Sequence, residues 1–179
     1  MKKIMVKDLS FEVFISEEKI KTRLAQMGND ITARFAGEEV LLLGVLNGSF
    51  IFMADLAREI HLPLSVEFLR ISSYTGTSSS GDVKSLMGLN TELKGKNVLI
   101  VEDIVDTGIS MDYLILELSK HNPKSLRIAT LLLKKEAFRF NYSLDYVGFE
   151  IPNKFVVGYG LDYDGLGRNL PDLYQLSET

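Results

Sequence analysis

The chain has 179 residues, of which 46% are hydrophobic and 25% are charged, and it contains no cysteine. Its 20 Lys and Arg residues and 24 Asp and Glu residues give a formal net charge of −4. This is the composition of an ordinary folded protein, and it excludes disulfide bonds, zinc–thiolate sites and cysteine nucleophiles. The mild acidity argues against a general nucleic-acid binder, because such proteins carry a basic excess.

No segment has the pattern of a signal peptide or a membrane span. The lysines near the N-terminus are not followed by the apolar stretch that a signal peptide requires. The longest apolar runs, 40–46 and 129–133, have the length of a strand and are too short to cross a bilayer. We therefore expect a cytoplasmic protein without a membrane partner, and the absence of cysteine fits a reducing compartment.

Helical and strand patterns alternate along the first part of the chain. Ser16 has the character of a helix N-cap, and apolar residues then recur every three or four positions until Gly37, which predicts an amphipathic helix. The apolar run at 40–46 predicts a strand that is buried on both faces. We expect next a turn at 47–49, a helix at 50–60 and a strand at 64–72.

Residues 73–88 interrupt this alternation. They contain three glycines and many serines and threonines, and few large apolar residues. This composition predicts a long, flexible loop. Because loops of this length inside a compact domain are usually functional lids or disordered segments, we interpret 73–88 as a flap over a ligand site.

A strand–helix–strand pattern follows the flap. Its expected elements are a strand at 97–101, a loop at 103–108, a helix at 109–121 and a strand at 126–133. Two apolar strands joined by a helix form a βαβ unit with parallel strands. Two more short strands are expected at 146–150 and 155–159. The whole pattern predicts one α/β domain with a central, parallel, twisted sheet flanked by helices.

The segment 102–110 combines acidic residues with the start of a helix. Glu102, Asp103 and Asp106 follow a buried strand, a position that is costly for carboxylates unless they meet cations, hydroxyl groups or protons. The small residues Thr107, Gly108 and Ser110 leave backbone N–H groups open to an anion at the helix N-terminus. Capping alone would need one carboxylate, not three. A phosphate site beside carboxylates indicates a sugar phosphate, with Mg²⁺ or ribose hydroxyls on the carboxylates.

The sequence VLIVEDIVDTG at 98–108 resembles the motif with which type I phosphoribosyltransferases bind phosphoribosyl pyrophosphate (PRPP). Three further segments are similar to the hypoxanthine-guanine phosphoribosyltransferases within this family. They are LLGVLNGSFIFMADL from residue 42, SSYTG from residue 72 and VGFEIPNKFVVGY from residue 147. The resemblance implies one domain over 1–179, with a core at about 16–150, a hood formed by the N-terminal segment and about 151–179, and the flap.

The resemblance also implies a reaction. Family members transfer the 5-phosphoribosyl group of PRPP to N9 of a 6-oxopurine, hypoxanthine or guanine, and release pyrophosphate, which serves purine salvage. Positive charge develops on the ribose, and Mg²⁺ neutralises the anionic leaving group. The expected cofactor is therefore Mg²⁺, the expected partners are PRPP and a purine base, and the expected assembly is a homodimer or homotetramer.

Matching the family motifs to this sequence assigns a role to individual residues. Asp106 is the expected catalytic residue, which accepts the proton of purine N7. The expected PRPP- and phosphate-binding residues are Glu102, Asp103, Asp106, Thr107, Gly108, Ile109 and Ser110. The expected metal ligands are Glu102, Asp103 and Asp162. The expected pyrophosphate loop and flap residues are Leu46, Asn47, Gly48, Ser73, Tyr74 and Arg168. The expected purine-binding residues are Lys134, Phe155, Val156 and Asp162.

The roles of Phe155, Lys134 and the turn at 46–48 can be related to the chemistry of the ligands and of the backbone. Phe155 would stack on the purine, and Lys134 would donate to O6, which favours a 6-oxopurine over adenine because the adenine 6-amino group is itself a donor. The turn Leu46-Asn47-Gly48 corresponds to one that contains a cis, non-proline peptide bond in relatives. Asn47 stands where many relatives have Lys or Arg.

Two other functions stay open at this point. The same fold and PRPP motif occur in nucleotide-sensing regulators that bind RNA, and such a protein would need a basic face. A phosphoribosyltransferase that prefers xanthine would share the acidic motif and the lysine, because backbone groups around the 2-position of the purine distinguish these bases.

Overall fold

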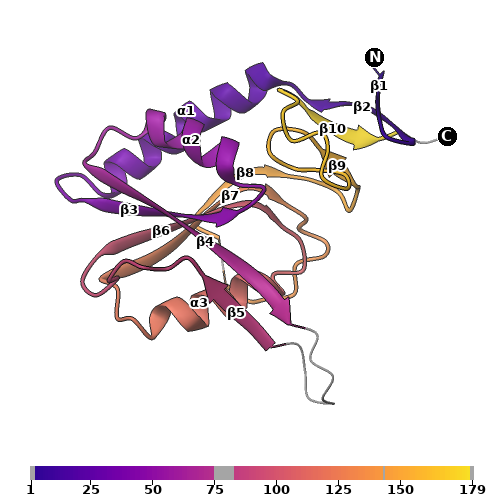
Figure 1. Ribbon diagram of the computed structural model, residues 1–179. Helices are drawn as coiled ribbons and strands as arrows, with labels where there is room; N and C mark the ends of the chain where they lie inside the picture. The colour runs from indigo at the N-terminus through magenta and orange to yellow at the C-terminus, as the bar shows by residue number, and fades with distance from the viewer. Residues whose placement is uncertain (1–2, 75–82, 143, 178–179) are drawn as a thin grey trace.

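The computed structural model describes residues 3–74, 83–142 and 144–177 of the chain, which form three helices and two β-sheets (Figure 1). The helices are α1 (Glu17–Arg34), α2 (Phe50–Glu59) and α3 (Ile109–Ser119). The larger sheet has the order β5 (Val83–Met87), β4 (Leu64–Tyr74), β3 (Val40–Leu46), β6 (Asn97–Val105), β7 (Ser125–Leu133) and β8 (Tyr146–Glu150). The smaller sheet has the order β1 (Lys3–Val6), β2 (Leu9–Ile15), β10 (Leu173–Leu176) and β9 (Val156–Val157).

Five strands of the larger sheet, β4, β3, β6, β7 and β8, are parallel, and β5 adds an antiparallel edge. Helices α1 and α2 cover one face of this sheet and α3 lies on the other, as Figure 1 shows. The predicted fold class is therefore confirmed. In the sheet, β4 lies on one side of β3 and β6 lies on the other. The strand order therefore reverses direction between β3 and β6, and the carboxyl ends of these two strands border the crevice where such sheets bind ligands.

The core explains why β3 is apolar at almost every position. Leu42 faces a buried cluster that contains residues of α1 and α2, and Leu41 and Leu43 face a second cluster with Met111 and Leu114 of α3. Successive side chains of a strand point to opposite faces, so a strand with helices on both faces needs apolar residues throughout. The predicted burial of β3 on both faces is confirmed.

The start of α1 is also as predicted. The Ser16 side chain accepts a hydrogen bond from the Lys19 N–H at 3.4 Å, and Glu17 and Glu18 occupy the first turn. The helix ends at Arg34, before Gly37, whose φ of 80° is left-handed. The N-terminal end of α1 thus receives both a side-chain cap and the negative charge that the helix dipole favours.

The predicted end of the strand at 101 is wrong. β6 continues to Val105, because β7 supplies pairing partners beyond residue 101: Glu102 lies opposite Thr130, and Val105 lies opposite Leu133. Glu102 and Asp103 are therefore held by a strand and not by the loop expected at 103–108. This extension fixes the direction of both carboxylates more firmly than a loop would.

The prediction of a continuous loop at 73–88 is wrong for its two ends. β4 runs to Tyr74, and β5 pairs with it in antiparallel register, with Ser73 opposite Lys84. β5 gains a strand partner in β4, and the composition of the segment alone does not reveal this pairing. Residues 75–82, the middle of the expected flap, lie outside the described residues.

The smaller sheet was not predicted, apart from the short strand near 155–159, of which β9 covers two residues. β10, near the C-terminal end, lies between β2 and β9 and pairs with both. Its residues Leu173 and Tyr174 are buried, Leu173 in the main core and Tyr174 against the smaller sheet's own cluster. The two ends of the chain therefore form one sheet, to one side of the larger sheet in Figure 1.

Replacing Leu173 by alanine is expected to lower the free energy of unfolding by about 2–5 kcal/mol, because a fully buried leucine leaves a cavity when it is truncated. Leu176→Ala is the matched control, because Leu176 lies on the same strand and is only partly buried. In urea unfolding followed by circular dichroism, Leu176→Ala should lower the free energy of unfolding clearly less than Leu173→Ala does. Equal losses would contradict the central position of Leu173.

No helix in the described part of the chain is both long enough and apolar enough to cross a bilayer.

Candidate active site

The end of β6 and the start of α3 line one cavity, whose walls include Glu102, Val105 and the segment 106–111. Gly108 lies at the helix N-cap with a φ of 87°, and a Cβ atom there would come within 2.6 Å of the Phe138 ring. Glycine is therefore required both by the backbone conformation and by the space. The structure brings Thr107, Gly108, Ile109 and Ser110 together at this helix N-terminus, where backbone N–H groups can bind an anion.

The two carboxylates of β6 are held by backbone groups. The Glu102 side chain accepts a hydrogen bond from the Asp103 N–H at 3.0 Å, and the Asp103 side chain accepts one from the Ile104 N–H at 2.7 Å. Burial raises the pKa of the Glu102 carboxyl well above its usual range, and the neighbouring Asp103 charge raises it further. A cation or hydroxyl donors beside these two carboxyl groups would favour the charged form of both.

The turn after β3 packs directly against this carboxylate pair. The Leu46–Asn47 peptide bond is cis, as the family resemblance implies. A Cβ atom on Gly48 would lie 1.5 Å from Asp103 Oδ2, so only glycine allows this contact. Asn47 Oδ1 accepts a hydrogen bond from Arg70 Nη2 at 2.5 Å. Arg70 lies within β4, opposite Leu46 at the end of β3. It was not predicted as part of the site, because its contact with Asn47 arises from the pairing of these two strands.

A second hollow joins the turn to the loop after β9. It is lined by Leu46, Asn47, Gly48, Glu102, Asp103, Ser110, Asp162 and Arg168, together with three apolar residues. Arg168 Nη2 lies 2.7 Å from Asp162 Oδ1, and the other Asp162 oxygen accepts a hydrogen bond from the Gly165 N–H at 2.7 Å. Both residues therefore face the carboxylates of β6 across this hollow. The side chains of Ser73 and Tyr74 lie outside what the structure describes.

A third hollow collects the residues expected at the purine. It is lined by Asp103, Ile104, Asp106, Lys134, Phe155, Val156, Leu161 and Asp162. Lys134 Nζ lies 2.9 Å from Asp106 Oδ2, and the Lys134 side chain is only 12% exposed. The Phe155 ring is 44% exposed and is supported by Phe11 and Tyr163, with ring centroids 6.1 Å and 5.8 Å away. An exposed aromatic face beside a buried lysine can hold a flat, polar ring.

The donor set at the second hollow fits Mg²⁺. Carboxylate oxygens are the ligands that Mg²⁺ takes from proteins, usually one or two of them, with water and substrate phosphates completing the shell. Within the described ranges, no three such side chains converge on one point. Glu102, Asp103 and Asp162 therefore provide separate carboxylates around one hollow, an arrangement that fits a cation shared with a phosphorylated ligand.

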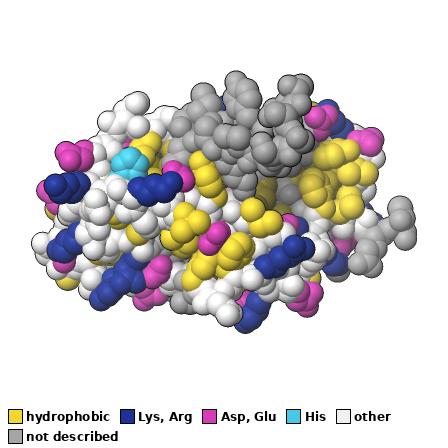
Figure 2. All heavy atoms as spheres, turned by 90° about the horizontal axis from the view of Figure 1, so that it is seen from below, with side chains coloured by type: hydrophobic (Ala, Val, Ile, Leu, Met, Phe, Trp, Pro, Cys, Tyr) yellow, Lys and Arg dark blue, Asp and Glu magenta, His cyan; other side chains and the backbone are white. Residues whose placement is uncertain are grey.

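An RNA-binding protein would need a basic face. Figure 2 shows the molecule from below, and the lysines and arginines drawn in colour there alternate with aspartates and glutamates. Over the described atoms of this view, the basic side chains form no continuous patch. This face gives no support to an RNA-binding function.

Residues 15–164 match the family model of the phosphoribosyl transferase domain. The chain is 46% identical over 175 residues to a hypoxanthine-guanine phosphoribosyltransferase of Dictyostelium discoideum, covering 95% of this chain and 97% of that protein. It is 47% identical over 163 residues to a hypoxanthine phosphoribosyltransferase of Salmonella typhimurium, covering 89% and 92% of the two chains.

A solved structure of a hypoxanthine-guanine phosphoribosyltransferase from Bacillus anthracis is similar to this chain, with a TM-score of 0.86 and 36% identity over 93% of this chain and 98% of that one. Sequence, fold and the crevice at the ends of β3 and β6 thus agree, and the chain belongs to the phosphoribosyltransferase family.

Proposed function

We propose that this chain is a hypoxanthine (guanine) phosphoribosyltransferase, a pentosyl-transferring enzyme of purine salvage. It transfers the 5-phosphoribosyl group of PRPP to N9 of hypoxanthine or guanine and releases pyrophosphate with IMP or GMP. The observation that carries this proposal is the meeting of a phosphate-binding helix start, a carboxylate pair and an aromatic pocket with a buried lysine in one crevice. Names of the similar proteins support the same reaction.

The PRPP end of the crevice is assigned to β6, α3 and the turn after β3. The 5-phosphate binds to the backbone N–H groups at the start of α3, with the hydroxyls of Thr107 and Ser110 as further donors. Glu102 and Asp103 face the ribose hydroxyls. The turn Leu46-Asn47-Gly48 and Arg168 bind pyrophosphate, and Arg70 adds a guanidinium group beside Asn47.

The metal is proposed to be Mg²⁺, held by Glu102, Asp103 and Asp162 together with the substrate. Mg²⁺ would neutralise the negative charge on the leaving pyrophosphate. The chain's own contribution at this point is the fixed direction of the carboxylates, which follows from their strand and from the backbone N–H groups that bind them.

The purine end depends on Asp106 and Lys134. Their 2.9 Å ion pair places a proton acceptor and a proton donor side by side on one wall of the pocket. A 6-oxopurine presents N7 and O6 as neighbours along one edge, so Asp106 can accept the N7 proton while Lys134 donates to O6. Phe155 covers the ring face, and the Val156 backbone is assigned to the N1 edge. Positive charge on the ribose develops within reach of the β6 carboxylates.

The assembly, location and domain limits are further parts of this proposal. The exposed apolar side chains of Val66 and Phe68 on β4 support a homodimer or homotetramer. We assign the protein to the cytoplasm. The whole of 1–179 is proposed as one domain, with a core at about 16–150, a hood made of the N-terminal segment and about 151–179, and a flap at about 73–88.

A spectrophotometric assay with PRPP, Mg²⁺ and each of hypoxanthine, guanine, xanthine and adenine tests the function. Hypoxanthine, guanine or both should be converted, adenine should not, and chelating the metal should abolish turnover. Failure with every base would refute the proposal. Faster conversion of xanthine than of the other bases would favour the xanthine-preferring alternative, and an RNA mobility shift at moderate salt would favour a regulator.

A further inference from the structure

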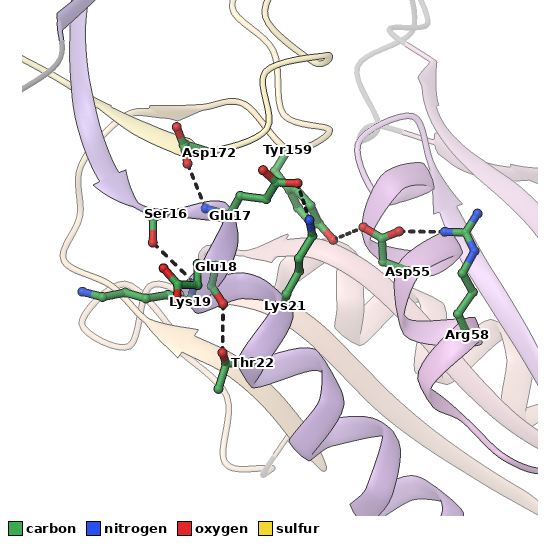
Figure 3. Close-up of polar contacts among 10 residues, drawn as sticks. All are labelled: Ser16, Glu17, Glu18, Lys19, Lys21, Thr22, Asp55, Arg58, Tyr159 and Asp172. Atoms are coloured by element: carbon green, nitrogen blue, oxygen red, sulfur yellow. Dashed lines mark hydrogen bonds and ion pairs between the residues drawn. The ribbon is translucent and has the colours of Figure 1, made fainter.

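We infer that Tyr159, which lies outside the three substrate hollows, is a positioning residue that holds the pyrophosphate turn and Arg168 at a fixed spacing. This inference rests on the proposed function and deepens it. Tyr159 is 3% exposed, and its hydroxyl donates a hydrogen bond to Asp55 Oδ2 of α2 at 2.5 Å. Figure 3 shows the Tyr159 hydroxyl directed at Asp55, whose other oxygen lies 2.8 Å from Arg58 Nη1.

The hydroxyl is a permanent donor at neutral pH. Burial raises the pKa of Tyr159 far above its usual range, and the hydrogen bond to the Asp55 carboxylate raises it further. The phenol therefore stays protonated, and the bond to Asp55 is between a neutral donor and a charged acceptor, a stronger type than one between neutral groups. The contact thus fixes the loop after β9 to α2.

The backbone on both sides of Tyr159 is unusual. Gly158, Tyr159 and Gly160 have φ values of 100°, 47° and 102°. A tyrosine in the left-handed region is uncommon and needs surrounding contacts to hold it. The Tyr159 N–H supplies one by donating to the Leu170 carbonyl at 2.8 Å. The hydroxyl bond to Asp55 supplies another.

This conformation places Gly160 between the two parts of the pyrophosphate site. A Cβ atom on Gly160 would lie 2.1 Å from the Gly48 carbonyl oxygen, so its backbone packs directly on the turn. The Gly160 N–H donates to the Arg168 carbonyl at 2.9 Å, and the Gly160 carbonyl accepts from Arg168 Nη1 at 2.7 Å. Arg168 Nη2 pairs with Asp162 Oδ1.

Two connections therefore meet at Gly160. One runs from α2, which starts directly after the turn, through Asp55 to the Tyr159 hydroxyl. The other runs from Gly160 to the Arg168 guanidinium. Removing the hydrogen bond between Tyr159 and Asp55 should let the loop after β9 shift relative to the turn. This shift would change the positions of Arg168 and Asp162 at the pyrophosphate site. The Asp106–Lys134 ion pair is a separate contact, and Asp162 is the residue of this linkage that lines the same hollow.

Tyr159→Phe tests the inference, because it keeps the ring and removes only the hydroxyl. We expect the KM for PRPP to rise about tenfold. The KM for hypoxanthine should rise clearly less, because the linkage reaches the purine hollow only through Asp162. Asp55→Ala removes the same bond from the other side and should act alike, and the double variant should be no worse than either single one. Should Tyr159→Phe fail to fold, Asp55→Ala gives the same readout.

Tyr174→Phe is the matched control. Tyr174 is similarly buried, at 2% exposed, and its hydroxyl also donates to a carboxylate, that of Asp172, instead of to a residue of α2. It should lower thermal stability without changing the KM for PRPP. Unchanged KM for PRPP in Tyr159→Phe, or an equal rise for both substrates, would overturn the inference. The wild-type turnover measured alongside tests the proposed function separately, since its absence refutes the function itself.

Discussion

Replacing Asp106 by asparagine is expected to lower kcat for hypoxanthine by about 10²–10⁴-fold, the usual contribution of a positioned general base. The affinity for PRPP should change little, because asparagine keeps the shape of the side chain and an oxygen that can accept from Lys134, which lies 2.9 Å from the present carboxylate. Only the ability to take the N7 proton is removed. Steady-state kinetics with each substrate varied, together with calorimetric titration of PRPP, separates the two effects.

Asp112→Asn is the matched control for this experiment. Asp112 lies in the first turn of α3, the helix that follows Asp106, and the same loss of one negative charge occurs there, away from the purine hollow. Turnover of this variant should stay near that of the wild type. If Asp106→Asn kept near-normal kcat, another group would have to accept the proton, and the role given to Asp106 would be wrong.

The local part of the site could be predicted from the sequence because its residues are contiguous. Glu102, Asp103 and Asp106 and the helix start that follows them lie within nine positions of the chain, and the structure places them around adjoining hollows. The purine-binding roles of Lys134 and Phe155 could be predicted only from the family resemblance. Lys134 directly follows β7, and Phe155 lies in the loop before β9, so only the tertiary fold brings them to Asp106.

Contacts between distant segments could not be predicted. The extension of β6 to Val105 depends on pairing with β7, and β10 has four residues, too few to show a pattern of its own. Its partners, β2 and β9, lie elsewhere in the chain. The hydrogen bond from Arg70 to Asn47 likewise joins residues 23 positions apart through the register of β3 and β4. Each of these features is decided by tertiary pairing, which a local sequence window does not contain.

Replacing Lys134 by alanine should weaken the purine site and reduce its discrimination against adenine. A hydrogen bond to a charged group contributes about 1.5–3 kcal/mol, so kcat/KM for hypoxanthine should fall by about 10- to 100-fold. The kcat/KM for adenine should fall less, because the adenine 6-amino group is itself a donor and gains no hydrogen bond from the Lys134 ammonium. Removing that ammonium also removes a repulsive contact with the 6-amino group. The ratio of the kcat/KM values for hypoxanthine and adenine should therefore fall by at least about tenfold.

Lys135→Ala separates this effect from a general loss of positive charge. Lys135 follows directly in sequence, but its side chain is 70% exposed and pairs with Glu150 at 3.0 Å, outside the purine hollow. Its removal should leave the ratio unchanged. Because Lys134 also pairs with Asp106, Lys134→Ala should lower kcat beyond its effect on base affinity, since the carboxylate loses the contact that directs it toward N7. A ratio that stays the same in Lys134→Ala would show that another group reads the 6-position, and the edge-reading role would have to be given to the backbone near Val156.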